Sequence, residues 1–425
     1  MKGIYILANI LLFIIILPKY LMVHSQNALK EPLATLWNID NEDIPKYVNI
    51  EKNLSKVDEI LKPFLDNDNF AGTSIDVIQN MVFVYTLNFS RAEQIKNLIE
   101  IRPYVNFLNF TQVINSTTNL NSIFEKISNS VKNYKTMGFT GYVSVKVNNI
   151  VIASCDEYKN NPGNSAFINA IKIYYPIFTY YYCSQTYNNP PSTSNTMLEN
   201  RNNLDKIMLT GEGINIFSKI RRSKTTCSAG FLARDRDQQS INYIATAGHC
   251  RVGPDDFYYF RPWNSDRITD LGTKSINFLN LIDFQLIYIN NNNIKPKPSI
   301  RNTDAGPGQY RELVIHDDIA VTSIGAHLCS SGFVTHVKCG YVETLNGFNA
   351  FEEIFHANVF VVGLLTIIGD SGGPIFSYHE DLLRVSLNGI LSAGFSDYVI
   401  GGISSVATLS SIFDIAKNIS LVIAD

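Results

Sequence analysis

Gly369-Asp370-Ser371-Gly372-Gly373-Pro374-Ile375 is the stretch that decides how this 425-residue chain is interpreted, together with Thr246-Ala247-Gly248-His249-Cys250 upstream. A serine hydroxyl is a poor nucleophile unless a base takes its proton, and imidazole does so when a carboxylate fixes its tautomer. Glycines around a serine allow a tight turn whose backbone N–H groups face the oxyanion formed by attack. A glycine turn beside an unrelated buried histidine is the alternative, but the ordered pair of motifs is far rarer than either alone. The sequence therefore predicts Ser371 as nucleophile and His249 as general base.

These motifs resemble those of the chymotrypsin-type serine proteases, in which the histidine, the aspartate and the serine follow one another in that order. The closer likeness is to the secreted microbial branch of streptogrisins and α-lytic protease. In that branch a motif similar to Cys227-Ser228-Ala229-Gly230-Phe231 leads into the histidine motif. Cys329-Ser330-Ser331-Gly332 and Cys339-Gly340 are similar to its second short disulfide loop. The resemblance implies a serine-type endopeptidase that acts on protein or peptide substrates.

The region after residue 209 has the pattern of an all-β domain, because short runs of strand-forming residues alternate with Gly, Asn, Asp and Pro. The expected strands are Ile241–Ala245, Phe284–Ile289, Glu312–His316, Val359–Ile367 and Arg384–Leu391. The resemblance implies two antiparallel six-stranded barrels, with His249 and Asp283 in the first and Ser371 in the second. Residues 209–425 are thus expected to form a trypsin-like serine protease domain.

Residues 26–183 contain a faint internal repeat. Phe70-Ala71-Gly72 and Phe139-Thr140-Gly141 each open an apolar run that an asparagine-containing break interrupts, which predicts two β-hairpins. Helical spacing follows Phe89 and Asn119, so a doubled α+β unit is expected. The pattern resembles the pro-region of the same proteases, which implies an intramolecular chaperone and inhibitor. An unrelated accessory domain is the alternative.

The amino terminus and the segment before residue 209 predict export and processing. Residues 1–25 have a positive start, a short apolar core and a polar end, as in a signal peptide cleaved near Ser25. A membrane anchor is the alternative, but the apolar run is short for a spanning helix. Residues 184–208 are rich in Asn, Pro, Ser and Thr and predict an exposed linker. Leu209-Thr210-Gly211-Glu212-Gly213 resembles the mature amino terminus of the family, which implies a secreted, extracellular zymogen cut near Met208.

Six cysteines in a chain expected to be secreted suggest three disulfides, whose pairing the count alone does not give. The resemblance implies Cys227–Cys250 and Cys329–Cys339. Cys155 and Cys183 either pair with each other or stay free. Asn-x-Ser/Thr sequons add candidate glycosylation sites, at Asn53, Asn88, Asn109, Asn115 and Asn418.

Asp283 is the expected acid of the triad, because an aspartate among apolar neighbours needs a partner when it is buried. Asp270 and Asp266 are competitors whose surroundings predict an exposed loop. The backbone N–H groups of Gly369 and Ser371 are expected to form the oxyanion hole.

The resemblance also implies a substrate-binding strand and a specificity pocket. Ser392-Ala393-Gly394 is similar to the strand that pairs with the substrate backbone by β-addition. Leu365 and Thr366 lie where the pocket wall is expected. No carboxylate is expected at the pocket base, so the chain is predicted to cleave after medium or large apolar residues. The further disulfide that the family often has near the serine loop is missing, since no cysteine follows Cys339.

Composition excludes several other classes. A chain of 425 residues exceeds one ordinary core, and its 45% hydrophobic and 17% charged residues are typical of globular domains. The net charge of −3, without a basic cluster, argues against nucleic-acid binding. No metal-ligand spacing occurs, so neither a metal nor a cofactor is expected. A secreted non-catalytic binding protein on a protease fold remains an alternative. An esterase elbow, by contrast, would place the acid and histidine after the serine.

Overall fold

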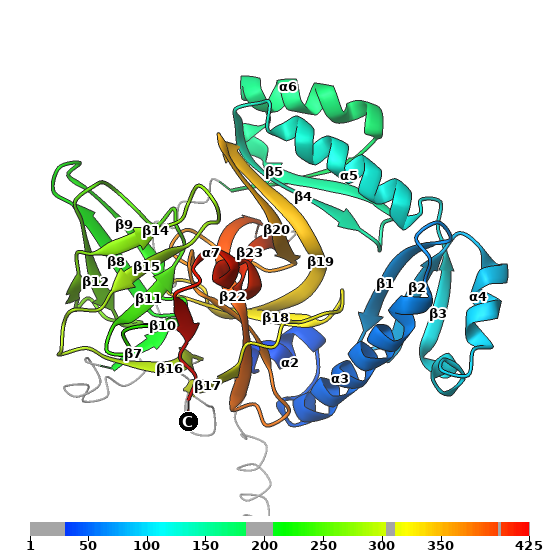
Figure 1. The fold of residues 1–425 in the computed structure, drawn as a ribbon, viewed down its shortest axis with the longest axis horizontal. Coiled ribbons are helices and arrows are strands. Elements are labelled where there is room, and N and C mark those ends of the chain that lie inside the picture. Colours follow the sequence, from blue (N-terminus) through cyan, green and yellow to red (C-terminus); the bar gives the residue numbers. More distant parts are fainter. Residues whose placement is uncertain (1–29, 184–206, 303–310, 398–400, 425) are drawn as a thin grey trace, which may run out of the picture.

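The computed structural model describes residues 30–183, 207–302, 311–397 and 401–424. The predicted signal peptide and the linker up to residue 206 lie outside these described residues. Figure 1 shows an N-terminal region of helices and sheets, blue to cyan, along one side of a β-rich region coloured yellow to red. A second β-rich region, coloured green, lies on the other side. The predicted fold class, an all-β domain preceded by an α+β region, is confirmed.

The second half of the β region is a closed ring of antiparallel strands. Neighbouring strands pair in the order β18-β19-β20-β23-β22-β21, and β21 pairs back with β18. The six strands are β18 (His327–Gly332), β19 (His336–Glu352), β20 (Ile354–Val362), β21 (Pro374–Tyr378), β22 (Arg384–Asp397) and β23 (Gly401–Thr408). Leu328, Val342, Ile375 and Val406 are among the apolar side chains that form its core. This ring is the six-stranded barrel predicted to carry Ser371.

The first half of the β region is built from two sheets around a shared core. One sheet has the order β13-β12-β8-β9 and the other β14-β15-β11-β10-β24. Their strands are β8 (Gly213–Ser218), β9 (Ser223–Ser228), β10 (Leu232–Asp235), β11 (Asn242–Thr246), β12 (Asp256–Arg261), β13 (Thr269–Gly272), β14 (Ser275–Asn277), β15 (Gln285–Tyr288) and β24 (Ile419–Leu421). The shared core includes Ile214, Ile244, Tyr258, Leu271 and Ile287. A backbone hydrogen bond from Asn290 to Leu271 (3.3 Å) links the two sheets.

Three further strands and a helix join the two halves. Strand β17 (Glu312–Asp317) pairs with β22, β16 (Lys295–Arg301) pairs with β17, and β7 (Ile207–Thr210) pairs with β16. Helix α7 (Leu409–Ile415) follows β23. Met208, the predicted end of the linker, is the second residue of β7 and is buried.

One predicted strand is displaced. The sequence predicted a strand over Val359–Ile367, whereas β20 ends at Val362 and the apolar residues that follow belong to the irregular loop before Ser371. Leu364 of this loop packs in the barrel core and Ile368 is exposed. A short apolar run does not reveal by periodicity alone whether it is a strand or a buried loop.

The N-terminal region consists of two copies of one unit, as the repeat predicted. In each copy a helix precedes an antiparallel hairpin, and a second helix returns the chain to a strand parallel to the hairpin. The first copy is α3 (Ile44–Leu61), β1 (Phe70–Asp76), β2 (Met81–Thr86), α4 (Phe89–Lys96) and β3 (Leu108–Gln112). The second is α5 (Thr117–Val131), β4 (Thr136–Ser144), β5 (Asn149–Cys155), α6 (Pro162–Ile171) and β6 (Ile177–Tyr181). Asn80 and Asn148 take the left-handed conformation at the two hairpin turns, at φ 53° and 51°.

The N-terminal region joins the second barrel at two places. Strand β4 pairs antiparallel with β19, so the barrel sheet continues through β4 and β5 to β6. Helix α3, which follows the short helix α2 (Pro32–Trp37), contacts β18 through Glu51 and His327. Within the described residues, no helix is both long and apolar enough to cross a membrane.

Candidate active site

His249 and Asp283 form the first part of the site. Nδ1 of His249 lies 2.8 Å from Oδ2 of Asp283, and the backbone N–H of His249 donates to Oδ1 at 2.9 Å. Asp283 follows the turn before β15, and His249 follows β11, which pairs with β15 in the sheet. Asn277 donates to the carbonyl of Gly248 at 2.6 Å and so fixes the loop that carries the histidine. The sheet therefore brings together the two residues that the sequence predicted as base and acid.

The charges of this pair support each other. Desolvation raises the pKa of Asp283, but the charge of His249 and hydrogen bonds from His249 and Ser392 outweigh it and lower the pKa. Desolvation likewise lowers the pKa of His249, and the Asp283 carboxylate outweighs that effect and raises it. The His249 side chain is 44% exposed, whereas that of Asp283 is 6% exposed. The acid is therefore held ionised inside the protein, and the imidazole remains open on its other side.

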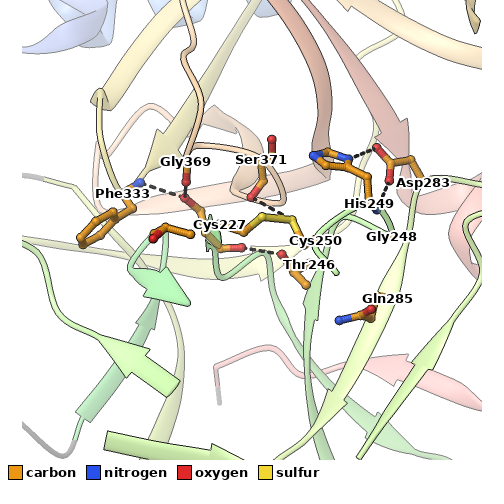
Figure 2. The surroundings of a disulfide bond; sticks show 12 residues. Cys227, Thr246, Gly248, His249, Cys250, Asp283, Gln285, Phe333, Gly369 and Ser371 are labelled. Atoms are coloured by element: carbon orange, nitrogen blue, oxygen red, sulfur yellow. Dashed lines mark hydrogen bonds and ion pairs between the residues drawn. A yellow bond between two sulfur atoms is a disulfide. The ribbon is translucent and has the colours of Figure 1, made fainter. Parts of the chain in front are cut away.

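Ser371 lies on the loop between β20 and β21, opposite the histidine. Figure 2 shows the His249 ring between Asp283 and Ser371, with one ring nitrogen directed to the carboxylate. No hydrogen bond joins Ser371 to His249, although both lie in the described part of the chain. Such bonds are often loose without substrate and tighten in the reacting complex. The arrangement places the predicted nucleophile and base on the two facing barrels.

Ser228 anchors the nucleophile loop, a role that sequence reasoning missed. Its backbone N–H donates to the carbonyl of Ser371 (2.8 Å) and its hydroxyl donates to the carbonyl of Gly369 (2.8 Å). The same hydroxyl accepts the N–H of Phe333 at 2.9 Å. Ser228 occurs in the motif Cys227-Ser228-Ala229-Gly230-Phe231, but that motif contains no indication of which residue its serine contacts.

Two backbone donors beside the nucleophile have no acceptor among the described residues. They are the N–H groups of Gly369 and Ser371, the pair predicted as oxyanion hole. Gly369 is buried and has φ 109°, and a Cβ there would lie 2.5 Å from Val334 Cγ2. Ser371 is half-buried, and both N–H groups are thus available to donate to an oxygen atom beside the nucleophile.

Asp370 orders the loop instead of taking part in the triad. Its carboxylate accepts the backbone N–H groups of Val334 (2.9 Å), Thr335 (3.0 Å) and Ile367 (3.0 Å). Complete burial raises the pKa of Asp370 in spite of these bonds. The carboxylate thus ties the nucleophile loop to the β18–β19 turn.

The substrate-binding strand predicted from sequence reaches the triad directly. Ser392 of β22 donates its hydroxyl to Oδ2 of Asp283 at 2.8 Å, and Gly394, two residues further, is exposed. Ser392 is therefore a third partner of the triad acid, in addition to its predicted position on the strand.

Hydroxyl groups join the predicted pocket wall at Thr366 to the strands β22 and β23. The N–H of Thr366 donates to Ser396 Oγ (3.0 Å), which in turn donates to the carbonyl of Thr366. Thr366 Oγ1 lies 2.8 Å from Ser404 Oγ, and Ser404 donates to the carbonyl of Leu364 (2.9 Å). A Cβ on Gly394 would lie 2.3 Å from Thr366 Oγ1. Thr366 therefore lies tightly against β22 and β23, and Ser396 and Ser404 are its partners there, which sequence reasoning missed.

Neither competing aspartate belongs to the site. Asp266 is exposed and pairs with Arg261 at 3.0 Å, and Asp270 is an exposed residue of β13. Within the described residues, the carboxylate that contacts His249 is that of Asp283.

Disulfides join Cys227 to Cys250 and Cys329 to Cys339, as the resemblance implied, and Cys155 to Cys183. The bond between Cys227 and Cys250 lies directly beneath Ser371 and His249 (Figure 2). Cys227, Cys250 and His249 also form the one group in the described chain whose atoms are close enough to share a metal ion. Because both sulfur atoms are bonded to each other, they offer no thiolate ligand.

Comparison with known proteins gave matches only among solved structures. No family model matches the sequence, and no curated protein matches it. Protease A of Thermobifida fusca is 20% identical and covers 51% of this chain and 100% of its own, with a TM-score of 0.37. A chymotrypsin of Cellulomonas bogoriensis is 18% identical, with coverages of 51% and 100% and a TM-score of 0.38. An α-lytic protease homologue, N4, is 21% identical, with coverages of 50% and 98% and a TM-score of 0.38.

Two of these neighbours, a chymotrypsin and an α-lytic protease homologue, have names of the proteases that the sequence motifs resemble. Similarities of this size carry no inference about activity, which depends on the residues of the site itself.

Proposed function

We propose that the chain is a secreted serine endopeptidase, made as a precursor, that cleaves peptide bonds through Ser371, His249 and Asp283. The observation that supports this most strongly is the convergence of three features at one place. These are a histidine paired with a buried aspartate, a serine opposite the histidine, and two unpaired N–H groups beside the serine. A binding protein on the same fold has no need of all three.

In this proposal each residue has a step. His249 takes the proton of Ser371 as its oxygen attacks the carbonyl carbon, and Asp283 stabilises the resulting imidazolium. The N–H groups of Gly369 and Ser371 stabilise the oxyanion of the tetrahedral intermediate. His249 then gives its proton to the leaving amine, which leaves an acyl-enzyme on Ser371, and water hydrolyses this ester by the same path.

The pocket walls support cleavage after short apolar residues. No carboxylate is among the side chains that join the walls, which disfavours Lys and Arg as substrates. Thr366 Oγ1 and Ser404 Oγ lie 2.8 Å apart, and we infer that this contact narrows the space for a substrate side chain, whereas the sequence predicted a medium or large one. We therefore infer a preference for residues such as Ala and Val.

The N-terminal region is proposed to be a pro-region that assists folding and inhibits the enzyme until it is removed. It extends the barrel sheet through the pairing of β4 with β19, and it ends, at Cys183, beside β22. The hydrogen bond from the N–H of Tyr182 to Asp397 (3.3 Å) places this end near the substrate-binding strand.

Replacement of the nucleophile tests the proposal. Ser371→Ala is expected to lower kcat by roughly 10⁴-fold or more, because the acyl-enzyme no longer forms. Hydrolysis of casein or a peptide library at near-normal rate by the folded variant would overturn the assignment and favour the binding-protein alternative.

A further inference from the structure

A buried chain of hydrogen bonds connects strand β4 of the N-terminal region with the substrate-binding strand β22. Thr140 Oγ1 donates to Oδ1 of Asn349 (2.8 Å), and Nδ2 of Asn349 donates to Oγ of Ser405 (2.6 Å). Ser405 Oγ also accepts the N–H of Ala393 (3.2 Å) and donates to the carbonyl of Ala393 (3.3 Å). The three side chains are 3%, 9% and 0% exposed, so water does not replace a missing partner.

The register of the sheet brings these groups together. Thr140 stands directly opposite Asn349 in the β4–β19 pair, and Ser405 stands directly opposite Ala393 in the β22–β23 pair. Opposite residues of antiparallel strands project from the same face, so their side chains meet. The amide of Asn349 then bridges the two pairs. Asn349 lies on β19, which pairs with β4 of the N-terminal region, and its partner Ser405 lies on β23, which pairs with β22.

The end of this chain is the place where β22 changes register. Its pairing with β23 shifts between Leu391 and Ala393, so Ser392 is the extra residue of a β-bulge. The bulge directs the Ser392 hydroxyl to Asp283 and leaves Gly394 exposed. Because Ser405 satisfies both backbone polar groups of Ala393, it fixes the bulge from the side away from the triad.

We propose that Asn349 and Ser405 are positioning residues that hold this bulge, and that Thr140 completes their network while the N-terminal region is bound. The inference rests on the proposed function, since it takes Ser371 as nucleophile and β22 as the strand that binds substrate backbone. Loss of the Ser405 hydroxyl leaves buried donors of Asn349 and Ala393 without an acceptor. The bulge then shifts, and extended peptides lose binding while acylation of Ser371 continues.

Kinetics of Ser405→Ala and Asn349→Ala, expressed from the full-length chain, test the positioning role. The concentration of active enzyme is measured by titration with a fluorophosphonate. A lower yield of folded protein then does not affect the values of kcat and KM. KM for an extended peptide is expected to rise roughly tenfold, as for one lost hydrogen bond, while kcat stays within about threefold. If Ser405→Ala does not fold, Ser405→Cys replaces it in the same kinetic measurement. The thiol has a similar size to the hydroxyl but is a weaker hydrogen-bond donor and acceptor.

Ser386→Ala is the matched control. Ser386, like Ser405, is a buried serine, but it lies near the start of β22 and its hydroxyl bonds to His379 Nε2 (2.9 Å). The KM of the Ser386→Ala variant is expected to equal that of the parent protein. An unchanged KM in both Ser405→Ala and Asn349→Ala, with normal titration, would overturn the inference. A processed parent protein, freed of the N-terminal region, that does not titrate would instead overturn the proposed function.

Thr140→Val and Thr140→Ser test the link to the N-terminal region. The first keeps the shape and removes the hydroxyl, and the second keeps the hydroxyl. In the intact chain, deuterium uptake by peptides that span Ala393 is expected to be faster in Thr140→Val and unchanged in Thr140→Ser. Equal uptake in the two variants would show that Thr140 does not stabilise β22.

Discussion

Glu51 of helix α3 and His327 of strand β18 form a buried pair across the boundary between the N-terminal region and the second barrel. Oε1 of Glu51 lies 2.7 Å from Nδ1 of His327, and Oε2 accepts the backbone N–H of His327 at 2.9 Å. The other ring nitrogen accepts the N–H of Tyr378 (2.9 Å), so the ring proton is on Nδ1 and is donated to Glu51. The pair thus fixes how α3 lies on the barrel.

Glu51→Gln is expected to destabilise the full-length chain by about 1–3 kcal/mol, because one amide oxygen cannot satisfy both donors of His327. Denaturant unfolding measures the change in the free energy of unfolding. Lys52→Ala is the control on the same helix, since the Lys52–Glu380 pair is exposed and is expected to contribute about 0–1 kcal/mol. Equal losses in the two variants would contradict the role of the buried pair.

Asp283→Asn is expected to lower kcat by about 10⁴-fold, because an amide opposite Nδ1 favours the wrong tautomer of His249. Asp270→Asn, at an exposed residue of β13, is the matched control and is expected to leave kcat unchanged. Steady-state kinetics on titrated enzyme decide the matter. A severe loss in Asp270→Asn with normal activity in Asp283→Asn would show that the acid is placed wrongly.

The pH dependence of kcat/KM is expected to follow His249. The ring acts as a base only when neutral, so activity falls as the pH drops through its pKa. Because Asp283 raises that pKa, the acid limb is expected above the value of about 6.5 for a free histidine. The midpoint of the acid limb is measured from kcat/KM between about pH 4 and pH 9. An acid limb with its midpoint well below about pH 6.5 would be inconsistent with the His249–Asp283 pair.

Thr366→Ala is expected to move substrate preference toward larger side chains, because we propose that the Thr366 hydroxyl, in contact with Ser404, narrows the pocket. The parent is expected to favour Ala or Val over Phe before the cleaved bond, and the variant to reduce this ratio by roughly tenfold. Thr335→Ala, in the nearby β18–β19 turn, is the control for a general effect on the loop. A parent that already prefers Phe would refute the narrow pocket.

Most residues of the candidate site were predicted from short motifs in the sequence. Ser371, His249 and Asp283 were predicted because each lies in a short pattern whose spacing reflects the chemistry. The doubled hairpin unit was predicted because its alternation and asparagine turns are local features, and the structure repeats the unit with Asn80 and Asn148 at its turns.

Contacts between residues far apart in the chain were not predictable in this way. Thr140 and Asn349 meet only because β4 is added to β19, and neither residue has a distinctive neighbourhood in the sequence. Ser404 contacts Thr366 from a strand whose position depends on closure of the barrel. The same holds for Glu51 and His327, which the register of a helix on a sheet brings together.

Labelling with a fluorophosphonate, followed by identification of the modified residue, tests the central claim most directly. The reagent reacts with a serine oxygen only when a base activates it and donors stabilise the adduct. The account predicts stoichiometric modification of Ser371 in the processed protein, and loss of labelling in His249→Ala. Absence of labelling in the folded, processed protein, or modification of a different serine, would contradict it.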